Sequence, residues 1–299
     1  MIDSDKQSFN LVPLLAGSEG TLAITTELTL KVVKIPAHKS LVAIFYDDFI
    51  KALEDARALL DTDPHAVETV DSNCLALAKE DEIYHQIRQM LPSNDQSVKA
   101  MNLVEWVGHD PKVVSQKAKD LCQKVATSPG LVVHLHVAKN EKEMTALWNL
   151  RKKSVGLLGN MPGDQQPVPF IEDTVVPPDS LAQYIKEFRA ALDRRGLKYG
   201  MFGHVDVGCL HVRPALNLQD PKERAQVKAI SLEINQLVKK YQGLVWAEHG
   251  KGFRSEFIEE YMGPTLYPVL KQIKKTSIKK IVPNTGELIE NKYGGFTPH

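Results

Sequence analysis

The sequence predicts an α+β fold in which two ferredoxin-like β-α-β-β-α-β units share an antiparallel sheet, with the helices packed on one face. Three observations support this prediction. The chain has 299 residues, enough to bury a sizeable core. Its composition, with 43% hydrophobic and 25% charged residues, is that of an ordinary soluble protein. The order of strand-like and helix-like segments occurs twice, and two such units most simply extend one sheet.

The first unit is expected between residues 40 and 137. Its strands and helices, in chain order, are predicted at 40–46, 49–60, 66–71, 101–108, 111–127 and 131–137. Pro111 suits the first position of its helix, because proline lacks the N–H that would find no partner there. A further helix at 74–91, which ends at Pro92, is inserted between the second and third strands.

The second unit follows a long helix at 141–158 and a Gly/Pro/Gln loop at 159–169. Its strands and helices, in chain order, are predicted at 170–176, 178–195, 197–204, 209–213, 220–241 and 244–247. A last, lysine-rich helix is expected at 264–280. Before the first unit a strand is expected at 23–33, where Pro36 then breaks the pattern.

The charge balance and the cysteines limit the class of protein. Lys plus Arg and Asp plus Glu both number 37, so no overall field favours nucleic acid or an anionic membrane. The three cysteines form no C-x-x-C pair, which argues against a disulfide framework and for a reducing compartment. The sequence begins without signal-peptide features, and no run of about 18 apolar residues predicts a transmembrane helix. We expect a cytoplasmic protein, with peripheral attachment to the inner membrane left open.

Two histidines and a Glu-His pair form the constellation that suggests chemistry. His204 and His211 are seven residues apart, so one unbroken strand would place them on opposite faces. A hairpin turning at Val207–Gly208 would pair them directly, and a wider loop would equally bring the two rings together. With Glu248, two imidazoles make a metal-binding set, and His249 then becomes a proton acceptor. Ordinary core or surface histidines are the alternative.

A glycine turn at Gly17–Thr21 precedes the first predicted strand. Gly17 and Gly20 let the backbone come close to a ligand, and successive N–H groups in such a turn can hold a phosphate. An ordinary turn before an ordinary strand explains the same residues, because a short glycine motif is weak evidence by itself.

Three stretches together resemble a known family. They are Gly17-Ser18-Glu19-Gly20-Thr21-Leu22, the stretch from Gly203-His204 through Gly208 to His211, and Glu248-His249-Gly250. In this order they are similar to the FAD-linked 2-hydroxy-acid dehydrogenases and oxidases of vanillyl-alcohol-oxidase type. That group includes D-lactate dehydrogenase, the glycolate oxidase D subunit and D-2-hydroxyglutarate dehydrogenase. The likeness is strongest to large bacterial members that carry FAD and iron–sulfur parts on one polypeptide.

The resemblance implies a role for each matching residue. The positions that match FAD contacts are Gly17, Ser18, Glu19, Gly20, Thr21 and Ile24. The positions that match ligands of a divalent metal, commonly zinc, are His204, His211 and Glu248. His249 matches the base that takes the proton of the substrate's 2-hydroxyl while hydride passes to the flavin. Arg151 matches a substrate-carboxylate position, and Arg213, which replaces a frequent asparagine, is a second candidate contact.

The resemblance also implies a division into domains. Residues 1–36 correspond to the C-terminal end of an FAD-binding domain, and residues 37–299 to the substrate or cap domain. The rest of the FAD-binding domain is expected before residue 1, and the three cysteines form no cluster for an iron–sulfur centre. The chain by itself is therefore expected neither to hold FAD stably nor to turn over. The particular 2-hydroxy acid, the electron acceptor and any oligomeric assembly are left open.

Two other functions would use the same residues. A flavin-free hydrolase would use the His/His/Glu set to activate a metal-bound hydroxide. A non-catalytic, ferredoxin-like interaction module would hold both histidines in its core without a metal. Ligand atoms lying far apart would remove support from every metal-based function, because zinc–ligand bonds are about 2 Å long.

Overall fold

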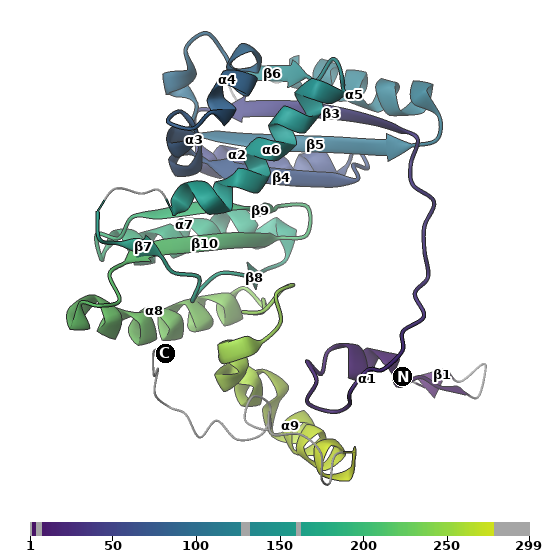
Figure 1. The fold of residues 1–299 in the computed structure, drawn as a ribbon, viewed down its shortest axis with the longest axis vertical. Helices are drawn as coiled ribbons and strands as arrows, with labels where there is room; N and C mark the ends of the chain where they lie inside the picture. The colour runs from purple at the N-terminus through teal and green to yellow at the C-terminus, as the bar shows by residue number, and fades with distance from the viewer. Residues whose placement is uncertain (1, 4–7, 127–131, 160–162, 278–299) are drawn as a thin grey trace. The chain divides into compact units, whose positions relative to one another are not determined.

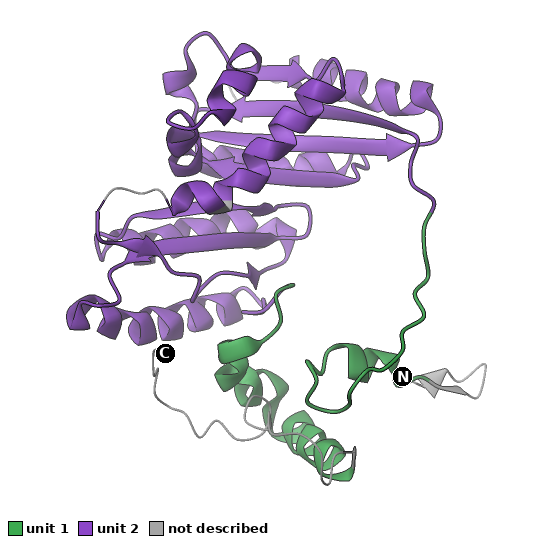
Figure 2. Ribbon diagram, in the orientation of Figure 1, with its two compact units in different colours: residues 1–33, 248–299 green, residues 34–247 purple. Residues whose placement is uncertain are grey.

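The computed structural model describes residues 2–3, 8–126, 132–159 and 163–277. The predicted segments include some residues outside these ranges: residue 127 of a helix, residue 131 of a strand, residues 160–162 of a loop and residues 278–280 of the last helix. Contacts divide the chain into two compact units (Figure 2). The larger unit is formed by residues 34–247, and the smaller unit by residues 1–33 together with residues 248–299.

The larger unit is built on one mixed-length antiparallel sheet, and the predicted α+β class is confirmed. In the described part of the chain its strands follow the order β6-β3-β5-β4-β9-β10-β7, with β8 also paired to β10 (Figure 1). Each recorded pair of strands in this sheet is antiparallel. The two repeats meet where β4 pairs with β9, the second strand of each unit.

The first repeat matches its predicted elements within a few residues. They are β3 (His38–Tyr46), α2 (Phe49–Leu60), β4 (Ala66–Asp71), β5 (Ala100–Gly108), α5 (Pro111–Ala126) and β6 (His134–Val137). The inserted helix is instead two helices, α3 (Ser72–Ala78) and α4 (Ile83–Ile87), followed by the 3-10 turn η1 (Arg88–Met90). The break falls where the Asp81 side chain accepts the N–H of Ile83 at 2.8 Å and starts a new helix.

The second repeat has the predicted order with shorter outer strands. It consists of β8 (Thr174–Val175), the 3-10 turn η3 (Pro178–Ser180), α7 (Leu181–Asp193), β9 (Tyr199–His204), β10 (Cys209–Leu216) and α8 (Pro221–Lys240). The strand predicted at 244–247 is only a bridge between Val175 and Leu244. The predicted loop at 159–169 contains β7 (Gln166–Pro167), which extends the sheet beside β10.

Helices cover both faces of the sheet. Successive strand residues point to opposite faces, so Leu41, Ala43 and Phe45 of β3 share one core with α3, α4 and α6 (Glu141–Leu158). On the opposite face the Asn102 amide of β5 donates to the Ala52 carbonyl of α2 at 2.8 Å. Here α2 packs against α7, and α7 against α8. The repeat helices thus occupy one face, while α6 and the inserted helices cover the other (Figure 1).

The smaller unit differs from its prediction. Residues 2–3 and 8–9 pair as β1 (Ile2–Asp3) and β2 (Ser8–Phe9), and α1 (Val12–Ala16) follows. The strand predicted at 23–33 is wrong: this stretch is irregular, and Ile24, Leu28, Leu30 and Val32 are exposed. The alternation of apolar side chains suits a strand face, but a strand forms only where a neighbour accepts its backbone hydrogen bonds. The described residues provide no such neighbour.

The C-terminal part of the smaller unit is helical from residue 252. A 3-10 helix, η4 (Gly252–Phe257), leads directly into α9 (Ile258–Ser277), so the predicted start at residue 264 is six residues late. Gly263, with φ of 67°, kinks α9 just before Pro264. Among the described helices, none is both long enough and apolar enough to cross a membrane.

Candidate functional site

The two predicted histidines lie on the β9–β10 hairpin, but not in the predicted register. His204 pairs with Cys209, and His211 pairs with Phe202. A four-residue loop, 205–208, joins the strands. The tighter turn at Val207–Gly208 is wrong because valine resists the positive φ that such a turn requires. The wider loop places its positive φ, 74°, on Gly208 instead.

This register nevertheless puts both imidazoles on the same face. Phe202 and His204 share one face of β9, as Cys209 and His211 do on β10. The ring centroids of His204 and His211 are 5.4 Å apart, and the rings are perpendicular. The side chain of His204 is 31% exposed, whereas His211 is 4% exposed and also packs against Phe202. The sequence-based expectation that the two rings come together is therefore met by a diagonal pair.

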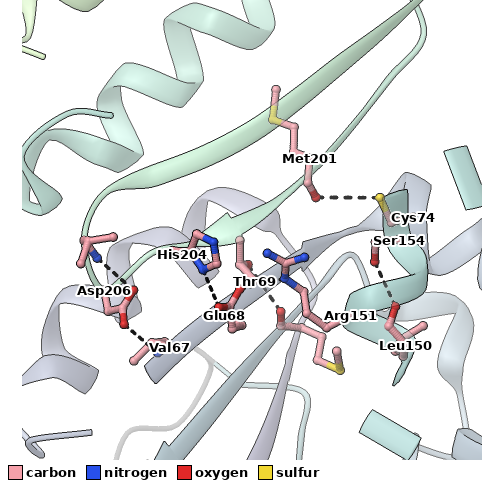
Figure 3. Close-up of polar contacts among 12 residues, drawn as sticks. Val67, Glu68, Thr69, Cys74, Leu150, Arg151, Ser154, Met201, His204 and Asp206 are labelled. Carbon is pink, nitrogen blue, oxygen red and sulfur yellow. Dashed lines mark hydrogen bonds and ion pairs between the residues drawn. The ribbon is translucent and has the colours of Figure 1, made fainter. Parts of the chain in front are cut away.

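A buried glutamate from the first repeat contacts His204. Glu68 lies directly opposite His204 in the β4–β9 pairing, and its Oε1 is 2.5 Å from His204 Nδ1. Its second oxygen, Oε2, accepts a hydrogen bond from Nε of Arg151 at 2.8 Å. Figure 3 shows the three side chains in a row, with the Glu68 carboxylate between the imidazole and the guanidinium. The Arg151 guanidinium also lies 4.8 Å above the Phe202 ring.

The second predicted arginine is held by another acidic residue. Arg213 Nη2 donates to Glu172 Oε1 at 3.1 Å, and Arg213 Nε donates to the other oxygen of the same carboxylate. This two-bond arrangement is the geometry in which arginine binds carboxylates most specifically. Glu172 is buried, so Arg213 balances a charge that would be costly without a partner.

Asp173, next to Glu172, is hydrogen-bonded to the end of the larger unit and lies near His211 of β10. It is fully buried and has φ of 73°, a conformation that non-glycine residues seldom adopt. Its carbonyl and its carboxylate both accept the N–H of Ala247 at 2.9 Å. A carboxylate oxygen of Asp173 and a ring nitrogen of His211 lie within 4.8 Å. Asp173 therefore anchors the residue that immediately precedes Glu248.

Glu248 and His249 belong to the smaller unit, whereas His204 and His211 belong to the larger unit. Glu248 Oε1 lies 3.3 Å from His249 Nε2, and both side chains are about half exposed. The larger unit ends at Ala247, and Glu248 is the next residue in the chain. The combined His/His/Glu ligand set stays a prediction.

The glycine turn is held within the smaller unit by Lys251. The Glu19 carboxylate accepts the Lys251 N–H at 2.9 Å and forms an ion pair with its ammonium group, which donates to the Gly17 carbonyl at 2.7 Å. Burial by itself raises the pKa of Glu19, but the hydrogen bonds and charge of Lys251 outweigh it and lower that pKa. Ser18 and Thr21 are buried, and their hydroxyls donate to Leu15 and Ser18 carbonyls at 2.8 and 2.5 Å.

The predicted FAD contacts thus divide into two kinds. Ser18, Glu19 and Thr21 are engaged by groups of the smaller unit, whereas Ile24 is 66% exposed. A Cβ added at Gly20 would have no atom within 4 Å. The backbone at Gly20 therefore has the open space that close approach of a cofactor requires.

The motif-based prediction missed four polar residues: Glu68, Glu172 and Asp173 in the larger unit, and Lys251 in the smaller unit. Glu68 carries a usable signal, because a charged residue amid the apolar positions of a predicted strand in the sheet requires a buried partner. The other three have none, because their importance depends on partners about 40 to 230 residues away in the chain. Only the fold brings those partners together.

The larger unit contains donors that suit a divalent metal. Two imidazoles lie side by side, one of them is oriented by a carboxylate, and the Asp173 carboxylate is close to the other. Nitrogen and carboxylate ligands of this kind bind zinc, and metal-binding histidines usually donate their second ring N–H to such a carboxylate. The donor types therefore suit the metal that the resemblance implies; His211 and Asp173 belong to a group of potential ligands within 4.8 Å of one another, and His204 does not.

Comparison with known proteins assigns the family. The profile of FAD linked oxidases, C-terminal domain, matches residues 35–276. The chain belongs to this family. As an FAD-linked oxidase C-terminal domain, it is 46% identical to the D-2-hydroxyglutarate dehydrogenase of Pseudomonas putida over 89% of the chain and 26% of that relative. It is 42% identical to the Escherichia coli protein of the same name, over 92% of the chain and 27% of that relative.

A more distant relative and two solved structures extend this comparison. The chain is 25% identical to the glycolate oxidase subunit GlcD of Bacillus subtilis over 95% of the chain and 58% of that protein. It matches p-cresol methylhydroxylase with a TM-score of 0.59 and 15% identity, covering 85% of this chain and 52% of that chain. It matches 4-ethylphenol oxidase from Gulosibacter chungangensis with a TM-score of 0.58 and 12% identity, covering 83% and 53%. These two structures show the fold.

The family assignment bears on the predicted functions unequally. The chain spans about a quarter of the length of the bacterial D-2-hydroxyglutarate dehydrogenases it matches. The family assignment supports an FAD-linked dehydrogenase and gives no support to the flavin-free hydrolase or the interaction module.

Proposed function

We propose that this chain is the substrate-binding domain of an FAD-dependent dehydrogenase that oxidises a D-2-hydroxy acid to the 2-oxo acid. The observation that carries this proposal is the Arg151–Glu68–His204–His211 cluster on one face of the sheet, in a member of the FAD-linked oxidase family. The names of its relatives favour D-2-hydroxyglutarate as substrate, with D-lactate and glycolate as the other members of the class.

Substrate binding is assigned to the two arginines. Arg151 would bind the carboxylate beside the 2-hydroxyl, because a guanidinium held through Nε can still present its terminal nitrogens to an anion. A dicarboxylate such as 2-hydroxyglutarate has a second anionic end, for which Arg213 is the candidate. Arg213 lies on β10 on the same face as His211, which supports this assignment.

Proton transfer is assigned to His249, and metal binding to His204, His211 and Glu248. A neutral imidazole can accept the proton of the 2-hydroxyl as the carbonyl forms. Asp173 supports this placement because it holds Ala247, the residue before Glu248 and His249. A divalent cation, when bound, would polarise the 2-hydroxyl and lower its pKa. FAD, when bound, supplies the hydride acceptor that no side chain provides.

FAD binding is assigned to a partner domain, and the first 36 residues would form the C-terminal end of that domain. Gly17–Thr21 would supply backbone groups to FAD, and the exposed apolar side chains between Ile24 and Val32 would be covered by that domain. An alternating apolar row is the pattern of a strand with one face buried. Iron–sulfur clusters, where the whole protein has them, would take their ligands from outside this chain.

The test is a hybrid enzyme in which this chain replaces the matching segment of the Pseudomonas putida relative. We expect the bound flavin to be bleached under anaerobic conditions by D-2-hydroxyglutarate, and by D-lactate or glycolate if the site accepts smaller acids. Substitution His249→Gln should lower kcat by about 10²–10⁴-fold, the usual contribution of a general base. His109→Gln, at an exposed position, is the matched control and should retain activity.

A folded hybrid that retains FAD but is bleached by none of the three acids would contradict the proposed function. Bleaching that persists unchanged in His249→Gln would instead contradict only the role of His249. The parent enzyme, assayed beside the hybrid, shows that the assay conditions support turnover.

A further inference from the structure

Glu68 uses both oxygens of one carboxylate to hold two different functional side chains. Oε1 lies 2.5 Å from Nδ1 of His204, and Oε2 accepts from Nε of Arg151 at 2.8 Å. The carboxylate is about 9% exposed and the Arg151 side chain about 10% exposed, so water competes little for these bonds. Figure 3 shows Glu68 between its two partners, on the strand next to β9.

We propose that Glu68 is the positioning residue of this site: it orients His204 for metal binding and Arg151 for substrate binding at the same time. The inference rests on the proposed function and deepens it. Glu68 touches neither the substrate nor the metal in this assignment, and it acts through the two side chains that do. One carboxylate from the first repeat would then set the geometry of a site whose predicted metal ligands come from elsewhere.

The first step of the argument concerns the tautomer of His204. An ionised carboxylate accepts hydrogen bonds and cannot donate one. For an ionised Glu68 and a neutral imidazole, the ring nitrogen facing Glu68, Nδ1, carries the hydrogen, and Nε2 carries the lone pair that a metal requires. Histidine ligands are commonly held in this way by a carboxylate behind the ring, which fixes both the tautomer and the ring direction.

The second step concerns Arg151. Its Nε is bound to Glu68, and its guanidinium plane is packed over the Phe202 ring at 4.8 Å. These two contacts restrict the movement of the guanidinium group, so its terminal nitrogens sample fewer directions than those of an unpaired arginine. A preoriented guanidinium loses less entropy when it binds a carboxylate than a mobile one does.

The third step concerns the rigidity of Glu68 itself. It sits in the middle of the sheet, where β4 pairs with β5 on one side and β9 on the other. His204 is its direct cross-strand neighbour, so the short contact follows from strand pairing rather than from a mobile loop. One oxygen of Glu68 is enough to pair with the charge of Arg151. The other oxygen of Glu68 contacts His204 instead.

The matched control is provided by Glu105 on the neighbouring strand β5. It is as buried as Glu68, lies on the same face of the sheet, and accepts a hydrogen bond from Trp148 Nε1 of α6 at 3.0 Å. It differs from Glu68 in its partner, a tryptophan in place of His204 and Arg151. Glu105→Gln therefore reports the effect of losing a buried carboxylate as such.

The experiment compares Glu68→Gln, Glu68→Asp and Glu105→Gln in the 299-residue chain. Zn²⁺ affinity is measured by competition with a chromophoric chelator, and the His204 tautomer by long-range ¹H–¹⁵N NMR of the metal-free protein. Glu68→Gln should weaken Zn²⁺ binding about 10–100-fold, the usual cost of losing such a carboxylate, and should mix the two tautomers. Glu105→Gln should leave the affinity and the tautomer of His204 unchanged.

Glu68→Asp covers the case in which the glutamine variant does not fold. It keeps a negative charge beside Arg151, but its shorter side chain cannot reach both partners, so Zn²⁺ affinity should still fall. Wild-type affinity and an unmixed Nδ1–H tautomer in either folded variant would overturn the role of Glu68. Failure of the wild-type chain to bind Zn²⁺ would overturn the metal site of the proposed function and, with it, the role of Glu68 in that site.

Discussion

The two repeats have the same order of elements but different strand lengths. In the first repeat β3 and β5 are nine residues long and pair along their whole length. In the second repeat the outer strands are reduced to the two residues of β8 and to the bridge between Val175 and Leu244. The first repeat therefore supplies most of the hydrogen-bonded framework on which the sheet depends.

Where strand pairing is shorter, in the second repeat, buried charged side chains take the place of regular strand residues. The region just before β8 contains Glu172 and Asp173, both buried, which hold Arg213 and Ala247. Side chains in such irregular backbone can turn toward a site, whereas a regular strand fixes them on alternate faces. The second repeat thus carries more of the candidate chemistry, and the first repeat contributes Glu68 at their junction.

The connection between the two central strands also differs. The first repeat inserts α3 and α4 between β4 and β5, while the second repeat joins β9 and β10 by the loop 205–208. A short loop tolerates few substitutions, and a connection that contains inserted helices tolerates more. Three predictions test this contrast, in order of decreasing expected effect.

Gly208→Ala should be the most damaging of the three changes. Gly208 has φ of 74°, and a Cβ there would lie 1.9 Å from the Val176 carbonyl oxygen. The main chain would have to move, so we expect a loss of about 4 kcal/mol in unfolding free energy, measured by urea denaturation. Gly196→Ala has a similar φ of 64° but no atom within 4 Å, and should cost about 1 kcal/mol. Equal losses would show that the 205–208 loop is not constrained by packing.

Asp71→Asn should change how stability depends on pH. Burial raises the pKa of Asp71 from 3.8 to about 6, although the Cys74 N–H, which it accepts as helix cap, lowers it. The folded wild type therefore favours the protonated form, and its stability should fall as the pH rises from about 4 to about 6. Asparagine keeps the cap without the charge, so the variant should gain up to about 3 kcal/mol relative to wild type across this range.

This second prediction has a control of opposite sign. Asp63 is exposed, and its pKa is lowered mainly by the hydrogen bond from Lys117. Wild type should therefore gain stability relative to Asp63→Asn as the pH rises through the acidic range. Urea denaturation at several pH values measures both pairs. Parallel curves for wild type and Asp71→Asn would contradict a raised pKa at Asp71.

The smallest effect is expected at the start of the first helix of each repeat. Asp48 begins α2 and accepts the N–H of Lys51 at 2.9 Å, whereas Ser180 begins α7 without a side-chain capping bond. Asp48→Ala should cost about 1 kcal/mol in unfolding free energy, the usual value of an N-cap, and Ser180→Ala only a few tenths. Thermal or urea denaturation of the two variants checks this. A larger loss for Ser180→Ala would reverse the expected difference.

Much of the fold could be predicted because it depends on local patterns. The helix Phe49–Leu60 places Phe49, Ala52, Leu53, Ala56 and Leu59 on one buried face, and its apolar spacing predicts both of its ends. The unbroken apolar run of residues 41–46 in β3 similarly predicts a strand that is buried on both faces. The strand predicted at 23–33 failed although its apolar residues alternate, because a pattern states what a segment could pair with and not whether a partner is present.

The candidate site was predictable only in its residue types. The spacing of His204, His211 and the Glu248-His249 pair indicated a shared site, and the two histidine rings do lie together. The direct pairing of the two histidines was wrong and the wider loop is observed: the positive φ lies at Gly208, and His204 pairs with Cys209, a two-residue shift that keeps both rings on the same face. Spacing along the chain contains no information on that choice.

What the sequence by itself determined is the repeated β-α-β-β-α-β order, the amphipathic helices and the likeness to the FAD-linked oxidases, because each of these is written in local periodicity or in short motifs. What only the tertiary structure decided is which charges meet. Glu68 reaches His204 and Arg151 from 136 and 83 residues away. Contacts at such separations arise from strand pairing and helix packing across the whole sheet, so no local stretch of sequence specifies them.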